Sequence, residues 1–583
     1  MHLKKHFAIL QWLPNYKRSN LLGDTSAGLI VAIMLVPQGM AYAMLAGLNP
    51  IHGLYAVTLP LLVYAILGSS RQLAVGPGAM ISLLVGAGIS SLSPENYSAY
   101  FYYTITLAFM VGIIQFLMGL FRLGFVVNFL SQPVIKGFTS AAALIIGFGQ
   151  LKHLLKLNFP SSNHIQNIFI GLASTIGQTH LLTMCIGLAG ILIIKFAKKI
   201  HPAIPGSLVA VILGIVLVRF LGLTDEGVMV LGEVPKGLPG LSLPTFELTT
   251  WTNLFPIAIT ISLVGFAESF SIAKTINARH KNYLINANQE LIALGMANIS
   301  SSMVRGFPVT GGLSRSAVND QSGAKTPLAS IISAGIIVMT LVFFTSYFFY
   351  LPYAILAAVI IAAVSGIVDW KSPIELWHKD RKDFYMFTAT FLVTLTMGIV
   401  LGILSGMILS LMLVIYKASR PHMAQLGRVP GTNNFRNIQR FNDLEINQDL
   451  IIVRIDGPIY FANVDFINEK INQWRAERSN AIKMIFLNME SVTSLDSTGA
   501  LTLQTWIKDW RNNDIDLYII GAKGPVRDVL VKWQLIETIG EDHIFLDTHT
   551  ALTYYEKNMD AKSLQKMGPY ALQSNFKNKK HRP

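Results

Sequence analysis

Two apolar segments of the chain are interrupted by glycine and proline at corresponding places. One carries VGPG at residues 75–78, and the other carries VTGG at residues 309–312. A helix that begins inside a membrane points free N–H groups and the positive end of its dipole at one place, so it can hold an anion there. Non-helical backbone at that depth is tolerated only where it lines a cavity or is buried in protein. The two breaks therefore predict a binding site for a small anion.

Two charged side chains accompany these breaks. Arg315 lies three residues beyond the second break, and a guanidinium group binds planar and tetrahedral oxyanions well. Glu268 lies in the apolar stretch ITISLVGFAESFSIA, where an ionised carboxylate is costly and usually functional. We expect Arg315 to bind the anion and Glu268 to carry a coupling proton. The structural alternatives are that Glu268 pairs with Lys274 or Arg315, or that the arginine snorkels towards the membrane surface.

The interrupted segments belong to a larger internal repeat. Residues 71–82 align with residues 305–316, and residues 37–43 align with residues 267–273 at nearly the same offset. This predicts two repeats of seven spans, at about 24–222 and 252–417, and an odd number of spans inverts one repeat relative to the other. Inverted repeats with broken helices point to a secondary transporter whose substrate site lies where the broken helices meet. The alternative is that the glycines only permit close helix packing.

The composition indicates membrane-spanning helices, which are the elements that can place such a site within a bilayer. Hydrophobic residues make up 52% of the 583 residues and charged residues only 13%, against roughly 25% charged in soluble domains. A wholly soluble enzyme is therefore nearly excluded. Many apolar stretches approach the roughly 20 residues that cross a bilayer. We expect about fourteen helical spans, at residues 24–46, 51–68, 73–90, 101–121, 125–151, 180–198, 204–222, 252–276, 286–302, 308–321, 327–347, 352–368, 384–400 and 401–417.

Charge and composition also divide the chain into segments. The net charge of +14 comes largely from basic loops on one side of the predicted spans, which places the N-terminus inside and leaves nucleic acid as a weak alternative. We predict a cytoplasmic N-terminal segment at 1–23, a transporter domain at 24–420, a small α/β domain at 440–556 and a basic disordered tail at 557–583. Cys185, the single cysteine, excludes an internal disulfide framework.

Several motifs together resemble the sulfate permease (SulP) family of anion transporters. They are VPQGMAYAMLAGLNPIHGLY at 36–55, the Gly76-Pro77 break, NQELIALGMANI at 288–299, GGLSRSAVNDQSGAKT at 311–326 and DSTG at 496–499. The resemblance covers residues 10 to 555. It implies fourteen spans in seven-plus-seven inverted repeats, divided into a core and a gate domain, a cytoplasmic STAS domain and a homodimer.

The resemblance also implies site residues, by motif. The anion pocket of the family falls on Gln38, Tyr42, Gly78, Ala79, Gly312, Leu313, Ser314 and Arg315. Glu268 matches the acidic position that is linked to proton symport in family members that have it. Several animal members have an aromatic residue where Gly78 stands, so pocket size and substrate do not transfer closely.

The turn DSTG carries a further candidate. Related bacterial anti-sigma antagonists have a phosphorylatable serine at the position of Ser497, which makes this residue a candidate regulatory site. Asp and Ser also cap helices well, and this structural interpretation is favoured for a transporter.

These observations predict a secondary active importer of a small oxyanion, sulfate first, by proton symport and alternating access. The alternative within the same fold is a bicarbonate or dicarboxylate transporter, for which sodium coupling stays open. From other classes, the alternatives are an anion channel or a STAS-linked membrane sensor. No nucleophile–base pair, phosphate loop or metal-spaced cluster is evident, so we expect neither an enzyme nor a cofactor or metal site. We expect the bilayer, a second copy and a cytoplasmic partner of the STAS domain as partners, in the cell inner (plasma) membrane.

Overall fold

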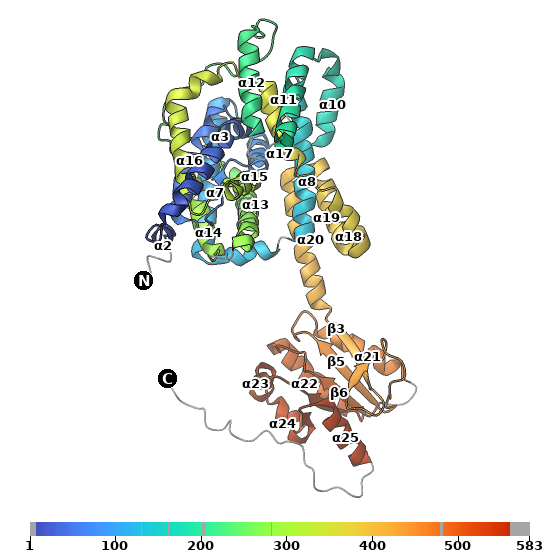
Figure 1. Cartoon of the computed structure of the whole chain (residues 1–583). Coiled ribbons are helices and arrows are strands. Elements are labelled where there is room, and N and C mark those ends of the chain that lie inside the picture. Colours follow the sequence, from blue (N-terminus) through green and yellow to red (C-terminus); the bar gives the residue numbers. More distant parts are fainter. Residues whose placement is uncertain are drawn as a thin grey trace. The chain divides into compact units, whose positions relative to one another are not determined.

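The computed structural model describes residues 7–129, 131–160, 162–200, 205–280, 283–478 and 482–559. It divides into two compact units, residues 1–410 and 411–583 (Figure 1). The first unit is helical apart from two very short strands, and the second is a mixed α/β unit. The basic tail that the sequence predicts at 557–583 lies, beyond residue 559, outside the described residues.

The first half of the helical unit follows the predicted apolar stretches. Its elements are α2 (Ile9–Trp12), α3 (Leu21–Leu45), α4 (Ile51–Tyr55), α5 (Leu59–Leu67), β1 (Val75–Gly76), α6 (Ala79–Ser90), α7 (Tyr97–Leu120), α8 (Gln132–Gly149), α9 (Leu151–Leu154), α10 (Ile165–Thr175), α11 (Leu181–Ile200) and α12 (Gly206–Phe220).

The second half has a similar order of elements. They are α13 (Leu248–His280), α14 (Ala287–Met303), β2 (Thr310–Gly311), α15 (Leu313–Gln321), α16 (Leu328–Met339), α17 (Tyr353–Ser365), α18 (Lys371–Lys379), α19 (Arg381–Met397) and α20 (Ile399–Ser419). Each of the fourteen predicted stretches contains helix, whereas α2, α10 and α18 of the first unit lie outside them. Six helices in the described part of the chain are long and apolar enough to cross a membrane. The number of spans stays a prediction.

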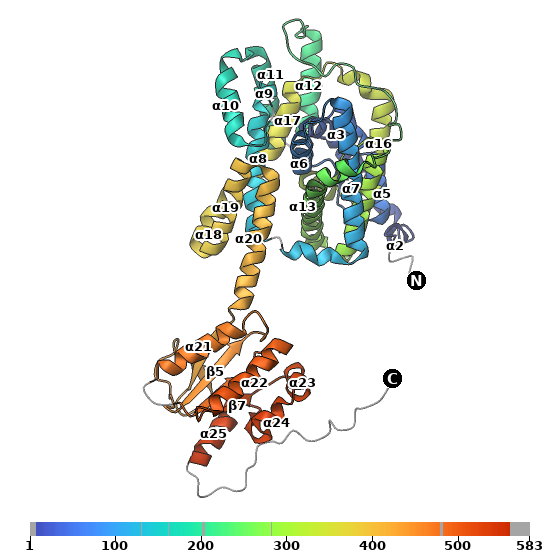
Figure 2. The same cartoon turned by 180° about the vertical axis from the view of Figure 1, so that it is seen from behind.

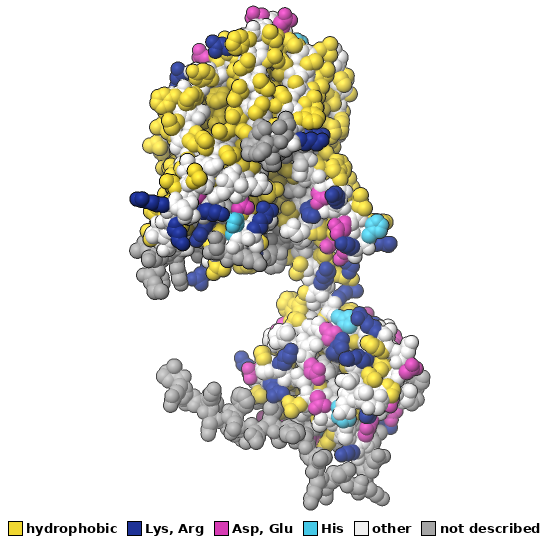
Figure 3. Space-filling view, in the orientation of Figure 1, with side chains coloured by type: hydrophobic (Ala, Val, Ile, Leu, Met, Phe, Trp, Pro, Cys, Tyr) yellow, Lys and Arg dark blue, Asp and Glu magenta, His cyan; other side chains and the backbone are white. Residues whose placement is uncertain are grey.

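The helices of the first unit form two groups that both views separate. In Figures 1 and 2, α8, α10, α18, α19 and α20 lie on one side of the unit, and α2, α7, α14 and α16 lie on the other. On one side α14 packs on α7 and α16 packs on α3, and on the other α19 packs on α8. Apolar side chains cover much of the visible face of this unit, while lysine and arginine gather towards its lower end (Figure 3). An apolar outer surface of this kind suits a bilayer.

The second unit is a six-stranded sheet with helices on both faces. The strands are β3 (His422–Arg428), β4 (Phe435–Asn437), β5 (Leu450–Asp456), β6 (Met484–Asn488), β7 (Asp516–Ile520) and β8 (Ile544–Phe545), in the order β4-β3-β5-β6-β7-β8. Strands β5 to β8 are parallel, and β3 is antiparallel to both of its neighbours.

Alternating side chains of these strands enter two separate cores. One core holds Ile451 and Val453 of β5 with the helices α21 (Val464–Ala476), α22 (Ser497–Arg511), α23 (Gly524–Lys532) and α24 (Leu535–Ile539). The other holds Ile452 with residues of α25 (Thr548–Met559), which alone among the described helices contributes to this second core. The period-two alternation expected of a sheet buried on both faces is thus met.

Candidate functional site

Two short antiparallel strands bring the interrupted segments together. β1 pairs with β2, so that Val75 lies opposite Gly311 and Gly76 lies opposite Thr310. Helix α6 begins three residues after the end of β1, and α15 begins two residues after the end of β2. The starts of both half-helices therefore lie beside one strand pair, although 234 residues separate Ala79 from Leu313 in the sequence.

Glycine precedes each half-helix because space is short, not because the backbone is unusual. Gly78 and Gly312 have φ angles of −113° and −102°, which any residue can adopt. A Cβ on Gly78 would lie 2.7 Å from a methyl carbon of Thr310, and a Cβ on Gly312 would lie 2.6 Å from the guanidinium of Arg315. Gly78 thus allows the close approach of the two halves, and Gly312 leaves room for the guanidinium of Arg315.

The guanidinium of Arg315 lies between the two half-helices. The residue is only 2% exposed and is the largest fully buried side chain of the described chain. Its Nη1 donates to the carbonyl oxygen of Pro77, just before α6, and its Nη2 lies 3.5 Å from the carbonyl oxygen of Thr310. Its Nε is buried without a hydrogen-bond partner among the described residues. One N–H of a fully buried cation is therefore left to bind a further acceptor.

Glu268 is the carboxylate that the sequence predicts for this site. It lies on α13, and its Oε2 is buried without a partner within the described ranges. Its charge and that of Arg315 act on each other and on the hydroxyl of Tyr42, yet no ion pair joins Glu268 to Arg315 or Lys274 in the described part of the chain. Lys274 instead lies 4.5 Å from the ring centre of Phe270. The carboxylate and the guanidinium are thus close enough for their charges to interact, but they form no direct ion pair in the described part of the chain.

The other predicted residues differ in their exposure. Gln38 and Tyr42 are both 7% exposed on α3, and Ala79 is buried at the start of α6. Leu313 is 60% exposed, and Ser314 is also exposed. The structure therefore does not place the side chains of Leu313 and Ser314 in the buried surroundings of Arg315. These two residues can contribute their backbone N–H groups, which lie in the first turn of α15.

A hydroxyl cluster behind β2 was not expected from the sequence. Ser269 accepts the Gly311 N–H at 2.8 Å, and its Oγ lies 2.8 Å from the Oγ1 of Thr310, which donates to the carbonyl of Gly265 at 2.9 Å. These bonds tie the strand to α13 one residue after Glu268. Ser269 is recognisable from sequence only as a polar neighbour of that carboxylate.

Asn298 of α14 is a second positioning residue that sequence reasoning misses. Its Oδ1 accepts the Val309 N–H at 2.7 Å, and its Nδ2 donates to the carbonyl of Val309 at 3.2 Å and to Oε1 of Gln115 at 3.0 Å. The side chain thus replaces the missing backbone partners just before β2. Its signal in the sequence is an amide within an apolar helix, where polar groups find partners on neighbouring helices.

The assembled site carries positive potential and neutral donors. It combines one buried guanidinium with the N-terminal ends of two helices, of which α6 begins at a buried residue and α15 at an exposed one. No group of three or more His, Cys, Asp or Glu could hold a metal ion within the described residues. The arrangement can bind a small anion and place a protonatable carboxylate beside it.

Ser497 lies outside this site, in the second unit. It is exposed at the first position of α22. The helix is capped by Asp496, whose Oδ1 accepts the Gly499 N–H at 2.7 Å and whose Oδ2 accepts the Phe461 N–H at 3.0 Å. The cap therefore needs no help from the Ser497 hydroxyl, and a phosphate there would meet the positive end of the helix.

Comparisons with known proteins identify both units. A model of the sulfate permease family matches residues 21–390, and a model of the STAS domain matches residues 442–551. Sulfate transporter 4.1, chloroplastic, of Arabidopsis thaliana is 37% identical over 94% of this chain and 82% of its own length. High affinity sulfate transporter 2 of Stylosanthes hamata is 32% identical over 94% of this chain and 86% of its own length.

Solved structures share the same fold. The overall structure of SLC26A9 matches with a TM-score of 0.88 at 25% identity and covers 96% of this chain and 94% of that chain. The transmembrane domain of a cyanobacterium bicarbonate transporter, BicA, matches with a TM-score of 0.59 at 24% identity over 68% of this chain and 98% of that chain, which is a likeness of fold alone.

Proposed function

The chain belongs to the sulfate permease family, and from that premise we propose that it imports sulfate together with a proton. The observation that carries the proposal is the buried guanidinium of Arg315 between two half-helix starts. The names of the relatives, which are sulfate transporters, support sulfate as the first anion to test. We place the protein in the cell inner (plasma) membrane as a homodimer, with the N-terminus and the STAS domain in the cytoplasm.

The anion is held by charge and by backbone donors. Arg315 supplies a fixed positive charge, and Gly78–Ala79 and Leu313–Ser314 supply N–H groups at the starts of α6 and α15, while the Gly312 N–H donates to the carbonyl of Ala74. Gln38 and Tyr42 on α3 complete the wall of the site. Such donors are oriented before the anion arrives, so little reorganisation is needed on binding.

The proton acts through Glu268. An ionised carboxylate near Arg315 cancels part of the positive potential and repels an incoming anion. A proton on Glu268 removes that repulsion, so proton and anion each raise the affinity for the other, as linkage requires. The half-helices α6 and α15, which pack on α3, then move with the helices on that side of the unit against the group of α8, α10, α18, α19 and α20. This movement exposes the loaded site to the other side of the membrane.

Uptake of radiolabelled sulfate into proteoliposomes tests this function. We expect accumulation above equilibrium when an inward proton gradient is imposed, and collapse of that accumulation when a protonophore is added. Bicarbonate and a dicarboxylate are added as competitors, with and without a sodium gradient. Accumulation of either of these anions in place of sulfate, or dependence on sodium, would replace the proposed substrate or coupling ion. Flux that only dissipates a gradient would indicate a channel.

A further inference from the structure

Two fully buried carboxylates lie outside the anion site. Asp24 is in the first turn of α3, Glu290 is in the first turn of α14, and both residues are 0% exposed. A carboxylate near a helix N-terminus is favoured by the helix dipole. Neither carboxylate forms an ion pair within the described ranges. Their partners are neutral donors, and these donors lie in the chain that leads into β1 and in the chain that leaves α15.

Glu290 holds the chain that leads into β1. Its Oε1 accepts the Ser69 N–H and the Ser69 hydroxyl, both at 2.7 Å, and the Ser70 N–H at 3.1 Å. Its Oε2 accepts the Tyr64 hydroxyl at 2.6 Å. Four donors from α5 and the segment after it thus converge on one carboxylate of α14.

Asp24 holds the chain that leaves α15 in the same manner. Its Oδ1 accepts the Lys325 N–H at 2.7 Å and the Thr326 N–H at 3.0 Å, and its Oδ2 accepts the Thr326 hydroxyl at 2.7 Å. In both cases two successive backbone N–H groups and the hydroxyl of one of the same two residues bind the carboxylate. Each carboxylate comes from one half of the first unit and binds the other half.

A ladder of hydrogen bonds connects the two clamped segments with the site. The Gln72 Nε2 donates to the carbonyl of Ala324 at 3.2 Å, and the Asn319 Nδ2 donates to the carbonyl of Gln72 at 2.9 Å. Nearer the strand pair, the Ala74 N–H donates to the hydroxyl of Ser316 at 2.9 Å. A shift of either clamped segment is therefore passed on to the starts of α6 and α15.

We propose that Asp24 and Glu290 are positioning residues, a reciprocal pair of clamps that fix the two half-helices relative to each other and thereby set the affinity for the anion. Neither side chain touches the anion. The proposal rests on the proposed function for its effect on affinity, but the clamps themselves can be tested without transport.

The first test compares alanine with amide variants in proteoliposomes. Glu290→Ala and Asp24→Ala leave buried N–H groups unpaired, whereas Glu290→Gln and Asp24→Asn keep one oxygen for the paired N–H groups and offer the hydroxyl an NH₂ donor. We expect the sulfate concentration for half-maximal uptake to rise about tenfold in the alanine variants and about twofold in the amide variants, with a smaller change in maximal rate. Glu375→Gln changes an exposed carboxylate, paired with Lys379 at 2.5 Å, and is the matched control that should have no effect.

Milder variants keep the test decisive if an alanine variant does not fold. Tyr64→Phe and Thr326→Val each remove one donor hydroxyl and should raise the half-maximal concentration about threefold. If wild-type protein accumulates sulfate and all folded variants keep the wild-type value, the inference is overturned.

Hydrogen exchange of the full-length protein in nanodiscs tests the clamps independently of transport. Glu290→Gln or Glu290→Ala should speed exchange selectively at residues 68–78, and Asp24→Asn or Asp24→Ala should do so at residues 322–328. Even acceleration throughout the first unit, or none in either segment, contradicts the clamps. Selective acceleration in a protein that takes up no sulfate supports the clamps and refutes the proposed function instead.

Discussion

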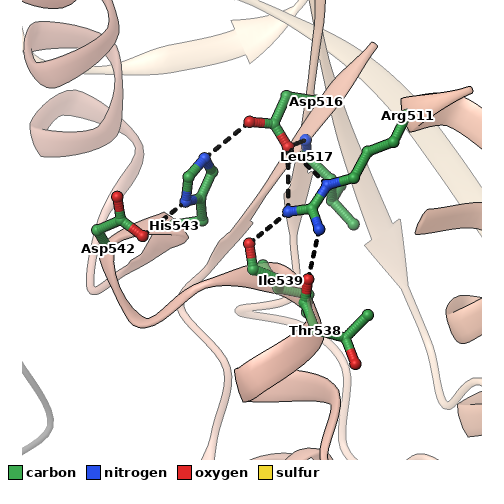
Figure 4. A network of polar contacts seen from close by, with 7 residues as sticks. All are labelled: Arg511, Asp516, Leu517, Thr538, Ile539, Asp542 and His543. Atoms are coloured by element: carbon green, nitrogen blue, oxygen red, sulfur yellow. Dashed lines mark hydrogen bonds and ion pairs between the residues drawn. The ribbon is translucent and has the colours of Figure 1, made fainter. Parts of the chain in front are cut away.

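The cluster around Arg315 in the first unit and the cluster around Arg511 in the second use similar side chains but differ in how fully these are paired. Arg511 donates to the carbonyls of Thr538 and Ile539, at 2.5 and 2.6 Å, and lies within 3.5 Å of Asp516 (Figure 4). His543 lies between two carboxylates, 2.7 Å from Asp516 and 2.9 Å from Asp542.

This difference distinguishes the Arg315 cluster, a candidate binding site, from the Arg511 cluster, which stabilises the second unit. The Arg511 cluster joins the ends of α22 and α24 to the start of β7, and its charged groups are paired with one another or with backbone carbonyls of the second unit. In the Arg315 cluster, Nε of the arginine and Oε2 of Glu268 are buried and unpaired among the described residues. Unpaired buried polar groups are costly and rare, so they mark a place where a ligand or proton can supply the missing partner.

The largest effect should come from removing the unpaired cation. Arg315→Ala loses charge-assisted hydrogen bonds, each worth about 1.5–3 kcal/mol, so we expect sulfate affinity to fall about tenfold to a hundredfold. Sulfate uptake and binding to the reconstituted protein measure this. Arg315→Lys keeps the charge but not the forked geometry and should recover only part of the affinity. Unaltered affinity in the alanine variant would show that the two helix starts suffice.

The next effect separates coupling from binding. Glu268→Gln keeps the shape of the side chain but cannot lose or gain a proton at neutral pH, so anion binding should persist while accumulation driven by a pH gradient disappears. Uptake with and without the gradient, alongside equilibrium sulfate binding, measures both properties. Concentrative uptake that stays as in the wild type would rule out this role.

Breaking the Arg511 cluster, whose groups are paired, should alter the stability of the second unit and leave the affinity for sulfate unchanged. Burial alone would lower the pKa of His543, but its hydrogen bonds with Asp516 and Asp542 and their charges raise it. The resulting stabilisation is complete below the unfolded pKa of about 6.5 and is lost as the pH rises through the higher folded pKa.

The pH dependence that Asp516 contributes to stability has the opposite sign. Burial alone would raise the pKa of Asp516, but hydrogen bonds from His543 and the Leu517 N–H lower it, so its stabilisation disappears as the pH falls below about 3.9. His543→Gln should destabilise the second unit by about 1 kcal/mol near pH 6 and remove the loss of stability above pH 6.5. Hydrogen exchange at α24 across this pH range measures the change. If the loss of stability above pH 6.5 persists in His543→Gln, another titrating group causes it.

The smallest effect is expected at Ser497. Because Asp496 already caps α22, Ser497→Ala should leave both the unfolding midpoint and sulfate uptake unchanged, whereas Asp496→Ala should cost about 1 kcal/mol. Thermal unfolding and phosphate analysis of protein from cells measure these outcomes. Phosphate on Ser497, with altered uptake in Ser497→Ala, would favour the regulatory interpretation.

The candidate site was predictable where a residue's type was itself unusual for its surroundings. An arginine and a glutamate in apolar segments and two Gly/Pro breaks stand out without any structure. Thr310 and Asn298 were not predictable as positioning residues, because hydroxyl and amide groups occur in many helices and only their partners show what they hold. The exposure of Leu313 and Ser314 likewise follows from how α15 is turned against its neighbours.

The sequence by itself determined the apolar stretches, the places where two of them break, the charged residues within apolar segments and the family. These properties depend on neighbours along the chain, such as helix propensity and the cost of burying charge. Only the tertiary structure decided that β1 pairs with β2, that Arg315 lies against Pro77, and that Asp24 and Glu290 each bind the opposite half. Such contacts join residues more than 200 positions apart, and which donor meets which acceptor is settled only when the helices pack.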